Sequence, residues 1–408
     1  MRTLLDSYAI LPAEKELHSS VAERFSLTRG GLVYRFQCRM GAGSEERICV
    51  ARRTVLVVAL TWLPLLFLSA VQGLALGKDV PIPFLQDFAV NVRLLIALPL
   101  LIISEVAIDH RLRTAVNHFL KSGLVTETTL PAFEGALEKV TRLRDHLLPE
   151  IVMLVLAYLT SYFQGSDAPI GTIPSWHLSP ASSPDTLSYA GWWFTSISLP
   201  VYRFLLFRWV WRMFLWAYFL RGVSKVKLVL IPTHPDMAAG LSFLSGAQQR
   251  LGPIAFAIGA VVAGQLGNAI AYAGVTVAGL KYVILAYCVC ATLILVTPLL
   301  LLAPALVPVK RRGLLDYGAL AASYTQAFDA KWVHGPPPAG ETLLGSSDIQ
   351  SLADLGNSFA IVRQMRVVPI SKSTLVSLAL TAALPMVPVL VFGTPTDQLI
   401  GTLVKLIA

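Results

Sequence analysis

The sequence predicts an all-α membrane protein with about seven transmembrane helices, an N-terminus in the cytoplasm and a C-terminus outside. First, 55% of its 408 residues are hydrophobic and only 14% are charged, whereas soluble domains are roughly 45 to 50% apolar and about 25% charged. Second, seven apolar stretches have about the 20 residues that a helix needs to cross a hydrocarbon core of about 30 Å. Third, basic residues gather in alternate connections between these stretches, as the positive-inside rule requires.

The basic residues give the orientation of the predicted spans. These spans run approximately over residues 54–76, 88–109, 148–165, 194–220, 252–273, 282–308 and 373–393. The N-terminal segment and every second connection carry 26 of the 33 Lys and Arg residues, and the opposite side carries only Lys78, Lys281 and Lys405. The basic side is therefore predicted to face the cytoplasm. Four more arginines lie within the predicted spans: Arg93, Arg203, Arg208 and Arg212.

The spans divide the chain into regions. These are a basic cytoplasmic N-terminal segment (1–53), a six-helix transmembrane region (54–308) with cytoplasmic loops 110–147 and 221–251, a cytoplasmic region with an amphipathic helix (309–372), and the seventh span with a short external C-terminus (373–408). The opening residues lack the apolar core and the cleavage site of a signal peptide, so we expect the N-terminal segment to stay attached.

Two cytoplasmic segments have the apolar spacing of amphipathic helices. In loop 110–147 the apolar residues fall near one helical face: Phe133, Leu137, Val140 and Leu147. A second helix begins after Ser346 or Ser347, either of which can cap it, and continues to about Met365. Its apolar residues recur at spacings of three and four: Ile349, Leu352, Leu355, Phe359 and Val362. This stripe packs on the bilayer surface or on the other loops, or it binds a partner.

The fourth predicted span places Arg203, Arg208 and Arg212 among aromatic and aliphatic residues. Each arginine at the centre of a membrane helix costs about 2.5 to 3.5 kcal/mol, so something must offset these charges. Glu105 and Asp109 lie one turn apart near the cytoplasmic end of the second span, and we expect an ion pair between Arg212 and Glu105. Alternatively, Arg203 and Arg212 reach opposite interfaces, with neighbouring tryptophans as cation-π partners. Arg208, nearest the middle, is the best candidate for a pore or a substrate pocket.

Thr233, His234 and Asp236 form a polar cluster in a proline-rich turn after the fourth span. The simplest interpretation is that Asp236 caps a helix beginning at Met237, while His234 packs or bonds to backbone. The cluster could instead act as a gate, exchange a proton, or bind a lipid headgroup at the inner leaflet. One His and one Asp are too few ligands for a metal ion, so we predict no metal site.

The fifth predicted span carries small residues at every fourth position: Ala255, Gly259, Ala263, Gly267 and Ala271. Such a seam lets helices approach closely. We expect it to pack within the molecule, with a subunit interface or a pore lining as the alternatives. Gln265 and Asn268 are polar at mid-membrane, so both are pore candidates and should find partners inside the protein.

Enzyme signatures are absent from the sequence. There is no Walker loop, no GxGxxG after a strand, no HExxH and no Ser, His and Asp arrangement typical of hydrolases. We therefore predict no catalytic residue and no cofactor, and we favour a protein that is not an enzyme. The sequence also shows no usable internal repeat.

Two blocks of the chain, roughly 200–245 and 345–395, carry distinctive motifs. The first block contains an RWxWR run (Arg208 to Arg212) and a PTHPD turn (Pro232 to Asp236), and the second begins with GSSDIQSLADLGNSFAIVRQMRVVPISK. These blocks resemble a family of uncharacterised bacterial integral membrane proteins. The resemblance implies a bacterial inner-membrane location and one unit made of the two motifs, but no activity. Ala239 stands where the resemblance implies a second glycine before Gly240.

Three functional hypotheses follow. The leading one is a channel or secondary transporter, a homo-oligomer whose intramembrane arginines face a water-filled path and bind an anionic solute. The second is a membrane-embedded lipid-handling enzyme that binds headgroup phosphate through its arginines, His234 and Asp236. The third is a non-catalytic signalling or assembly subunit that docks through the helix at 347–365. The expected partners are the lipid bilayer and further copies of the chain; nucleic acid is not expected, because the basic charge sorts by side of the membrane.

Overall fold

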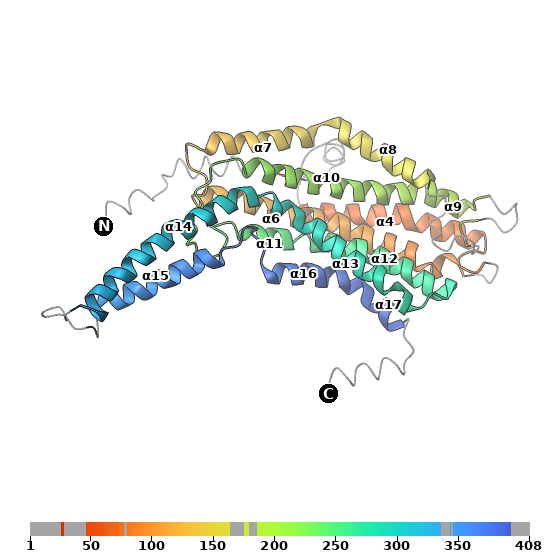
Figure 1. Cartoon of the computed structure of the whole chain (residues 1–408). Coiled ribbons are helices and arrows are strands. Elements are labelled where there is room, and N and C mark those ends of the chain that lie inside the picture. The colour runs from red at the N-terminus through yellow and green to blue at the C-terminus, as the bar shows by residue number, and fades with distance from the viewer. Residues whose placement is uncertain are drawn as a thin grey trace.

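The structure is a computed structural model. It describes residues 26–27, 46–76, 80–163, 175–178, 186–335, 343 and 346–392. Within these ranges every regular element is helical, and two isolated β-bridges are the only strand-like contacts. The predicted all-α class is therefore confirmed for the described part of the chain. The long helices lie side by side in one elongated bundle, and two of them leave it as a projecting arm (Figure 1).

The first hairpin of the bundle consists of α4 (Glu46–Val71) and a long interrupted helix. The interrupted helix is made of α5 (Phe88–Val92), the π-turn η3 (Arg93–Ala97) and α6 (Leu98–Lys121). The predicted second span ended at residue 109, but the helix continues for three more turns, because the polar stretch after this residue keeps a buried apolar face. The end of the bundle at which α6 finishes, predicted to be cytoplasmic, is called the basic end below.

The second hairpin has the same plan. α8 (Leu147–Phe163) runs back along an interrupted helix made of α9 (Tyr189–Trp193), the π-turn η4 (Phe194–Ser198) and α10 (Leu199–Val223). α7 (Leu130–Asp145) precedes α8 at a bend of 47°.

α7 is the helix that the apolar spacing of loop 110–147 predicts. Its residues Phe133, Leu137 and Val140 are buried as expected. Leu147 does not belong to this face: it is the first residue of α8 and is 46% exposed. The bend between the two helices rotates it away from the α7 stripe.

The remaining bundle helices pack around a seam of small residues. They are α11 (Phe243–Gln249), α12 (Gly252–Ala273), α13 (Val277–Leu300), α16 (Lys372–Ala383), the 3₁₀ turn η6 (Leu384–Met386) and α17 (Val387–Phe392). In the predicted seam on α12, a Cβ on Gly267 would lie 3.6 Å from the ring of Phe88, and one on Gly259 would lie 3.1 Å from the carbonyl oxygen of Ala382. From Ala255 to Gly267 the seam is therefore occupied by α5 and by the end of α16, within the molecule, whereas its last residue, Ala271, is exposed.

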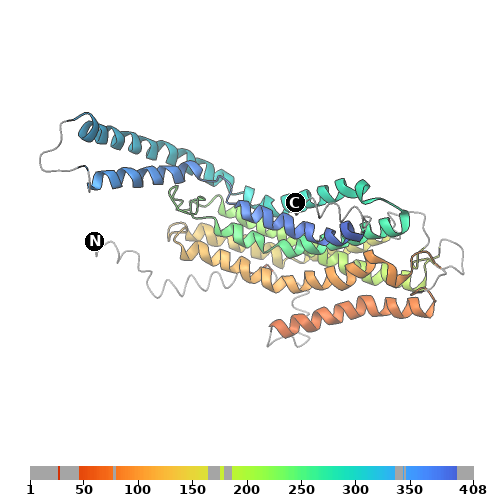
Figure 2. The same ribbon diagram turned by 90° about the horizontal axis from the view of Figure 1, so that it is seen from below.

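The predicted sixth span, 282–308, is wrong in one respect. The chain turns at residues 301–302 and begins a new helix, α14 (Ala303–Phe328), with Pro304 in its first turn. α14 leaves the bundle and pairs with α15 (Ser347–Gln364), and together they form the projecting arm (Figures 1 and 2).

α15 confirms the predicted amphipathic helix. Phe359 from its apolar stripe lies 3.7 Å from a Cβ built on Gly318 of α14, and Val362 is fully buried. The stripe therefore packs on another part of the same chain. Ser346 occupies the predicted N-cap position, but its side chain makes no capping hydrogen bond.

Five helices among the described residues are long and apolar enough to cross a membrane. They are Val50–Val71, Phe88–Lys121, Phe243–Ala273, Val277–Leu300 and Lys372–Val391, and α7 with α8 makes a sixth if the bent pair is one span. The predicted fourth span forms a long helix with three arginines but does not meet this criterion. The number of seven spans stays a prediction.

Apolar side chains point outward over much of the bundle. Only 22% of the most apolar stretch of α4, and the same share of α13, is buried, and Phe67 and Ile294 are 68% and 64% exposed. Soluble monomers rarely expose apolar patches larger than a few hundred Å². These helical, apolar segments are compatible with an integral membrane protein.

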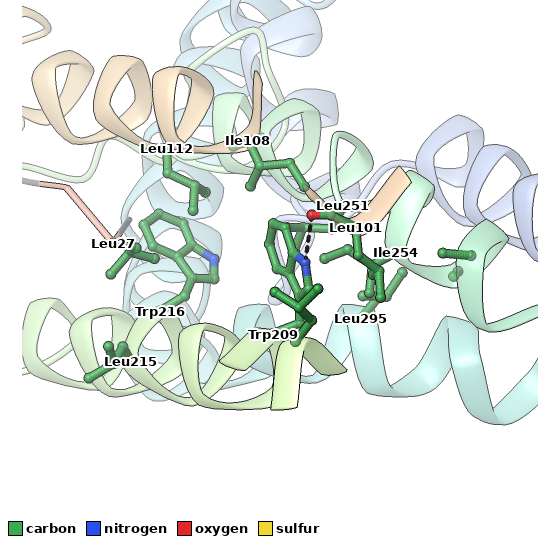
Figure 3. Packing of buried hydrophobic residues seen from close by; sticks show 14 of the residues in the cluster. Leu27, Leu101, Ile108, Leu112, Trp209, Leu215, Trp216, Leu251, Ile254 and Leu295 are labelled. Carbon is green, nitrogen blue, oxygen red and sulfur yellow. Dashed lines mark hydrogen bonds between the residues drawn. The ribbon is translucent and has the colours of Figure 1, made fainter. Parts of the chain in front are cut away.

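The inside of the bundle is closed by large side chains at the basic end. Trp216 and Leu27 lie beside Leu112, and Trp209 contacts α6 further from this end, at Leu101 (Figure 3). Each tryptophan also uses its indole N–H. Trp209 Nε1 donates to the carbonyl of Leu101 at 3.0 Å, and Trp216 Nε1 donates to Gln248 at 3.1 Å.

Candidate functional site

Glu105 of α6 is the centre of a buried charge cluster. Its Oε1 accepts from Nη1 of Arg212 at 2.9 Å and lies 3.8 Å from Nη1 of Arg208, while its Oε2 accepts from Nη1 of Arg53 at 2.8 Å. Glu105, Arg208 and Arg212 are each less than 9% exposed. The expected ion pair between Arg212 and Glu105 is therefore present. These four residues are called the Glu105 cluster below.

Two aromatic rings hold the arginines of α10 from their own helix. The guanidinium carbon of Arg212 lies 4.9 Å from the ring centre of Trp209, and that of Arg208 lies 5.9 Å from the ring centre of Phe204. Cation-π contacts were the alternative to the ion pair, and Arg212 has both. It does not extend to an interface, because it is only 5% exposed.

The Glu105 cluster holds more positive than negative charge. Arg208 and Arg212 share one carboxylate oxygen, and Glu150 of α8 is the other carboxylate whose charge acts on Arg208. The 3.8 Å contact of Arg208 is longer than a hydrogen bond. Among the described residues, Nη2 of Arg212 is buried and has no hydrogen-bond partner. Both guanidiniums therefore keep donors to spare beside a shared counter-ion.

Asp109 does not join the cluster, although it follows Glu105 by one turn. Both of its carboxylate oxygens accept from the hydroxyl of Ser26 at 2.9 Å, Oδ1 accepts from the N–H of Leu27 at 2.8 Å, and Oδ2 accepts from Nε of Arg113 at 3.0 Å. Arg144 of α7 donates to the carbonyl of Ser26. Asp109 thus fixes a short piece of the N-terminal segment at the basic end of the bundle.

Arg203 lies outside the Glu105 cluster, five residues before Arg208, and is 8% exposed. The fourth arginine within the predicted spans, Arg93, begins the π-turn η3. It is 3% exposed, and its guanidinium carbon lies 5.9 Å from the ring centre of Phe194 and 5.6 Å from that of Tyr202. The three predicted arginines of the fourth span are therefore all buried, but only two of them meet Glu105.

Asp236 does not cap a helix at Met237, as the sequence suggested, because the next helix begins only at Phe243. Its carboxylate accepts the backbone N–H groups of Ala238 at 2.8 Å, Gly240 at 3.1 Å and Ser242 at 3.0 Å. These three hydrogen bonds hold the pKa of Asp236 below its ordinary value, although burial opposes the shift. Asp236 is therefore the organising acceptor of the loop.

The loop after Asp236 needs left-handed backbone. Met237, Ala239 and Gly240 have φ of 55°, 54° and 95°. Ala239, where the resemblance implies glycine, still adopts this conformation, at the steric cost that a Cβ carries there. The tight turn thus forms without the second glycine.

His234 and Thr233 lie at the edge of this loop. Nδ1 of His234 is 2.9 Å from Asp236, the imidazole is 44% exposed, and the hydroxyl of Thr233 is 3.5 Å from that of Tyr317 on α14. The guanidinium of Arg366 donates to the carbonyl of Asp236 at 2.9 Å. The turn therefore joins the arm to the bundle, and it is separate from the Glu105 cluster.

Asn268 has the internal partners that the sequence predicts. Its amide donates to Asp87 at 2.9 Å and accepts from the N–H of Phe88 at 2.9 Å. Asp87 also accepts from the indole of Trp176 at 3.0 Å. Gln265 differs: in the part of the chain that the structure describes, it is half-buried and its side chain makes no hydrogen bond. Asn268 therefore belongs to a structural network at the end opposite the Glu105 cluster.

Arg53 and Asp87 were not singled out from the sequence, and Arg93 was named as an arginine within a span but not as a site residue. Arg53 directly precedes an apolar run, where a basic residue is the ordinary sign of a membrane interface. Asp87 lies just before a span and has the same ordinary explanation. Arg93 carried a signal, because it is an arginine within an apolar stretch, but no carboxylate at its depth drew attention to it.

No known protein family, no curated protein and no solved structure matches this chain. The resemblance of its RWxWR and PTHPD motifs to a bacterial membrane family therefore stays a prediction.

Proposed function

We propose that this chain is an integral membrane channel or secondary transporter for an anionic solute, and that Arg208 and Arg212 bind the solute. The observation that carries this proposal is that two buried guanidiniums share a single carboxylate oxygen of Glu105. A buried cation is costly unless an opposite charge and hydrogen bonds compensate it. An anion that enters the cluster supplies both.

The roles of the four residues follow from their distances. Arg208, at 3.8 Å from Glu105, has the weakest hold on the resident carboxylate and is the group that receives the solute first. Nη2 of Arg212 is a buried donor beside it. Arg53 holds Glu105 from the other oxygen at 2.8 Å and keeps the carboxylate in place when a solute competes for the arginines of α10.

The lipid-handling alternative has less support. It requires Asp236 or His234 to face a headgroup, yet both carboxylate oxygens of Asp236 already accept backbone N–H groups. The assembly alternative requires a free apolar stripe on α15, yet this stripe packs on α14. The lipid-handling alternative also needs the arginines to act on the same headgroup as His234 and Asp236, yet the Asp236 turn and the Glu105 cluster are separate. The assembly alternative gives the Glu105 cluster no role.

Tracer uptake into liposomes tests the proposal. The purified full chain is reconstituted, and uptake of radiolabelled inorganic phosphate, chloride and succinate is compared with that of empty liposomes. We expect uptake of at least one of the three anions, with Arg208→Ala lowering the initial rate roughly 10- to 100-fold, the loss that corresponds to one hydrogen bond to a charged group. Arg208→Lys keeps the charge and should retain more activity.

Arg142→Ala is the matched control. Arg142 also pairs with a carboxylate, Glu138, but its side chain is 78% exposed on α7. Its removal should leave uptake unchanged. Wild-type protein that takes up none of the three anions, or Arg208→Ala protein that matches the wild type, would overturn the proposal.

A further inference from the structure

The two interrupted helices of the bundle repeat each other element by element. Phe88 and Tyr189 begin the short helices α5 and α9, and Arg93 and Phe194 begin the π-turns η3 and η4. Leu98 and Leu199 begin α6 and α10. Each pair is separated by 101 residues. The sequence showed no usable repeat, because few side chains are shared; the repeat is one of backbone construction.

The details of the two segments agree as well. Each begins at an N-cap whose side chain accepts the backbone N–H three residues later, from Asp87 to Val90 and from Ser188 to Gly191. In each, the π-turn is closed by a leucine N–H on the carbonyl five residues earlier.

A proline explains why each π-turn lies where it does. Pro99 and Pro200 each directly follow the leucine that closes a π-turn. Proline cannot donate to the carbonyl four residues before it and clashes with that carbonyl in a regular helix. The wider π-turn accommodates the ring. The proline, the π-turn and the N-cap occupy equivalent positions in both segments. The two hairpins are therefore two copies of one structural repeat, in which α4 and α8 precede the interrupted helices.

The two π-turns meet at equivalent positions. The guanidinium carbon of Arg93 lies 5.9 Å from the ring centre of Phe194, its counterpart in the second repeat. In a two-fold arrangement, equivalent residues touch each other only beside the axis. The contact therefore places the pseudo-symmetry axis of the two hairpins between η3 and η4. Transporters built from repeats bind their solutes at the repeat interface, where helices are interrupted, and π-turns are frequent at functional sites.

We propose that Arg93 is a second binding group for the same anion, at the interface between the two repeats; this inference rests on the proposed transport function. Arg93 lies 12 residues before Glu105 on one interrupted helix, so at a rise of 1.5 Å per residue the two sites are about 18 Å apart. That separation covers more than half of a hydrocarbon core of about 30 Å. An anion that leaves the Glu105 cluster therefore meets Arg93 before it reaches the opposite end of the bundle.

The aromatic neighbours of Arg93 suit this role. Phe194 and Tyr202 lie within 6 Å of its guanidinium carbon and attract its charge through their ring faces. Carboxylate and phosphate groups bind a guanidinium through its N–H donors. The two rings thus position the guanidinium of Arg93, and hydrogen bonding by the guanidinium favours an oxyanion as the ligand.

The dependence of uptake on anion concentration tests this inference. Proteoliposomes are prepared with the basic end inside, and the initial rate of inorganic phosphate or succinate uptake is measured against outside concentration. Arg93→Gln should raise the half-saturating concentration roughly tenfold, the loss of about one charge-assisted hydrogen bond. Phe194→Leu keeps the charge but removes one ring, and it should give a smaller rise.

Lys281→Gln is the matched control, because Lys281 is also a cation near the end of the bundle opposite the Glu105 cluster and lies 4.9 Å from the ring centre of Tyr282. It should leave the half-saturating concentration unchanged. If wild-type protein carries no anion, the proposed function falls. If wild-type protein carries the anion but Phe194→Leu and Arg93→Gln leave the half-saturating concentration as it was, only the role of Arg93 falls.

Discussion

Replacing Glu105 by Gln should destabilise the protein more than any replacement of a surface carboxylate. The substitution keeps the shape of the side chain but leaves the guanidiniums of Arg53, Arg208 and Arg212 facing one another without their shared counter-charge. Two unit charges 4 Å apart interact by about 4 kcal/mol at an effective dielectric constant of 20. Removing one partner of a buried pair costs about 3 to 5 kcal/mol.

This free energy converts into a measurable shift of the melting temperature Tm. With an unfolding entropy of about 2.1 cal/mol/K per residue, a chain of 408 residues loses about 4 to 6 °C. Glu138→Gln is the matched control, since Glu138 is 61% exposed and pairs with Arg142; an exposed pair contributes at most about 1 kcal/mol, or about 1 °C. Thermal unfolding in detergent micelles measures both.

A double variant separates charge repulsion from lost packing. Adding Arg208→Gln to Glu105→Gln removes one of the three facing cations, so the double variant should melt above Glu105→Gln alone. If Glu105→Gln melts within 1 °C of Glu138→Gln, or if Arg208→Gln lowers the Tm of Glu105→Gln further, the cluster is not the buried charge centre described above.

Three further predictions concern other parts of the molecule. Asp109→Asn weakens the contacts with Ser26 and Leu27, so limited proteolysis should cut the N-terminal segment faster than in the wild type, and equal rates would contradict the anchor. The pKa of Asp236 is lowered, so the ionised carboxylate stabilises the fold above the ordinary Asp pKa, and this stabilisation is lost as pH falls through the lowered pKa. Asp236→Asn should therefore flatten the fall in Tm between pH 5 and pH 3, about the range of Asp titration. A fall in Tm equal to that of the wild type would contradict this role of Asp236. Gly264→Ala places a Cβ 2.9 Å from a backbone oxygen and should lower the free energy of unfolding by about 1 to 3 kcal/mol. Gly246→Ala has open space around the new Cβ and should leave the free energy of unfolding unchanged or raise it by up to about 1 kcal/mol.

The sequence predicted the parts of the fold that depend on composition over a whole turn or more. The amphipathic spacing located α7 and α15, and the cost of an arginine in an apolar segment led to Glu105 as the partner of Arg212. These predictions succeeded because the position of a residue along a predicted helix gives both the helical face on which it lies and its approximate depth in the membrane.

Contacts between distant segments escaped the sequence. The hydrogen bonds from Ser26 to Asp109 span 83 residues, and no local pattern links these two positions. The break after Leu300 was missed because the run from 282 to 308 is apolar throughout, so hydropathy cannot show where it turns. The two π-turns were missed because proline marks an interrupted helix but does not say how the backbone accommodates it.

If the Glu105 cluster accepts an anion, an added anion should rescue a variant that lacks the carboxylate of Glu105. The Tm of Glu105→Gln is measured in increasing concentrations of inorganic phosphate or succinate, with Glu138→Gln in the same solutions as the control for ionic strength. A bound anion replaces the missing carboxylate and stabilises by about 2.7 kcal/mol when its concentration is 100 times its Kd, so either probe should raise the Tm of Glu105→Gln by more than that of the wild type. Adding Arg208→Ala should abolish the rise. A Tm of Glu105→Gln that does not respond to these anions would contradict the account.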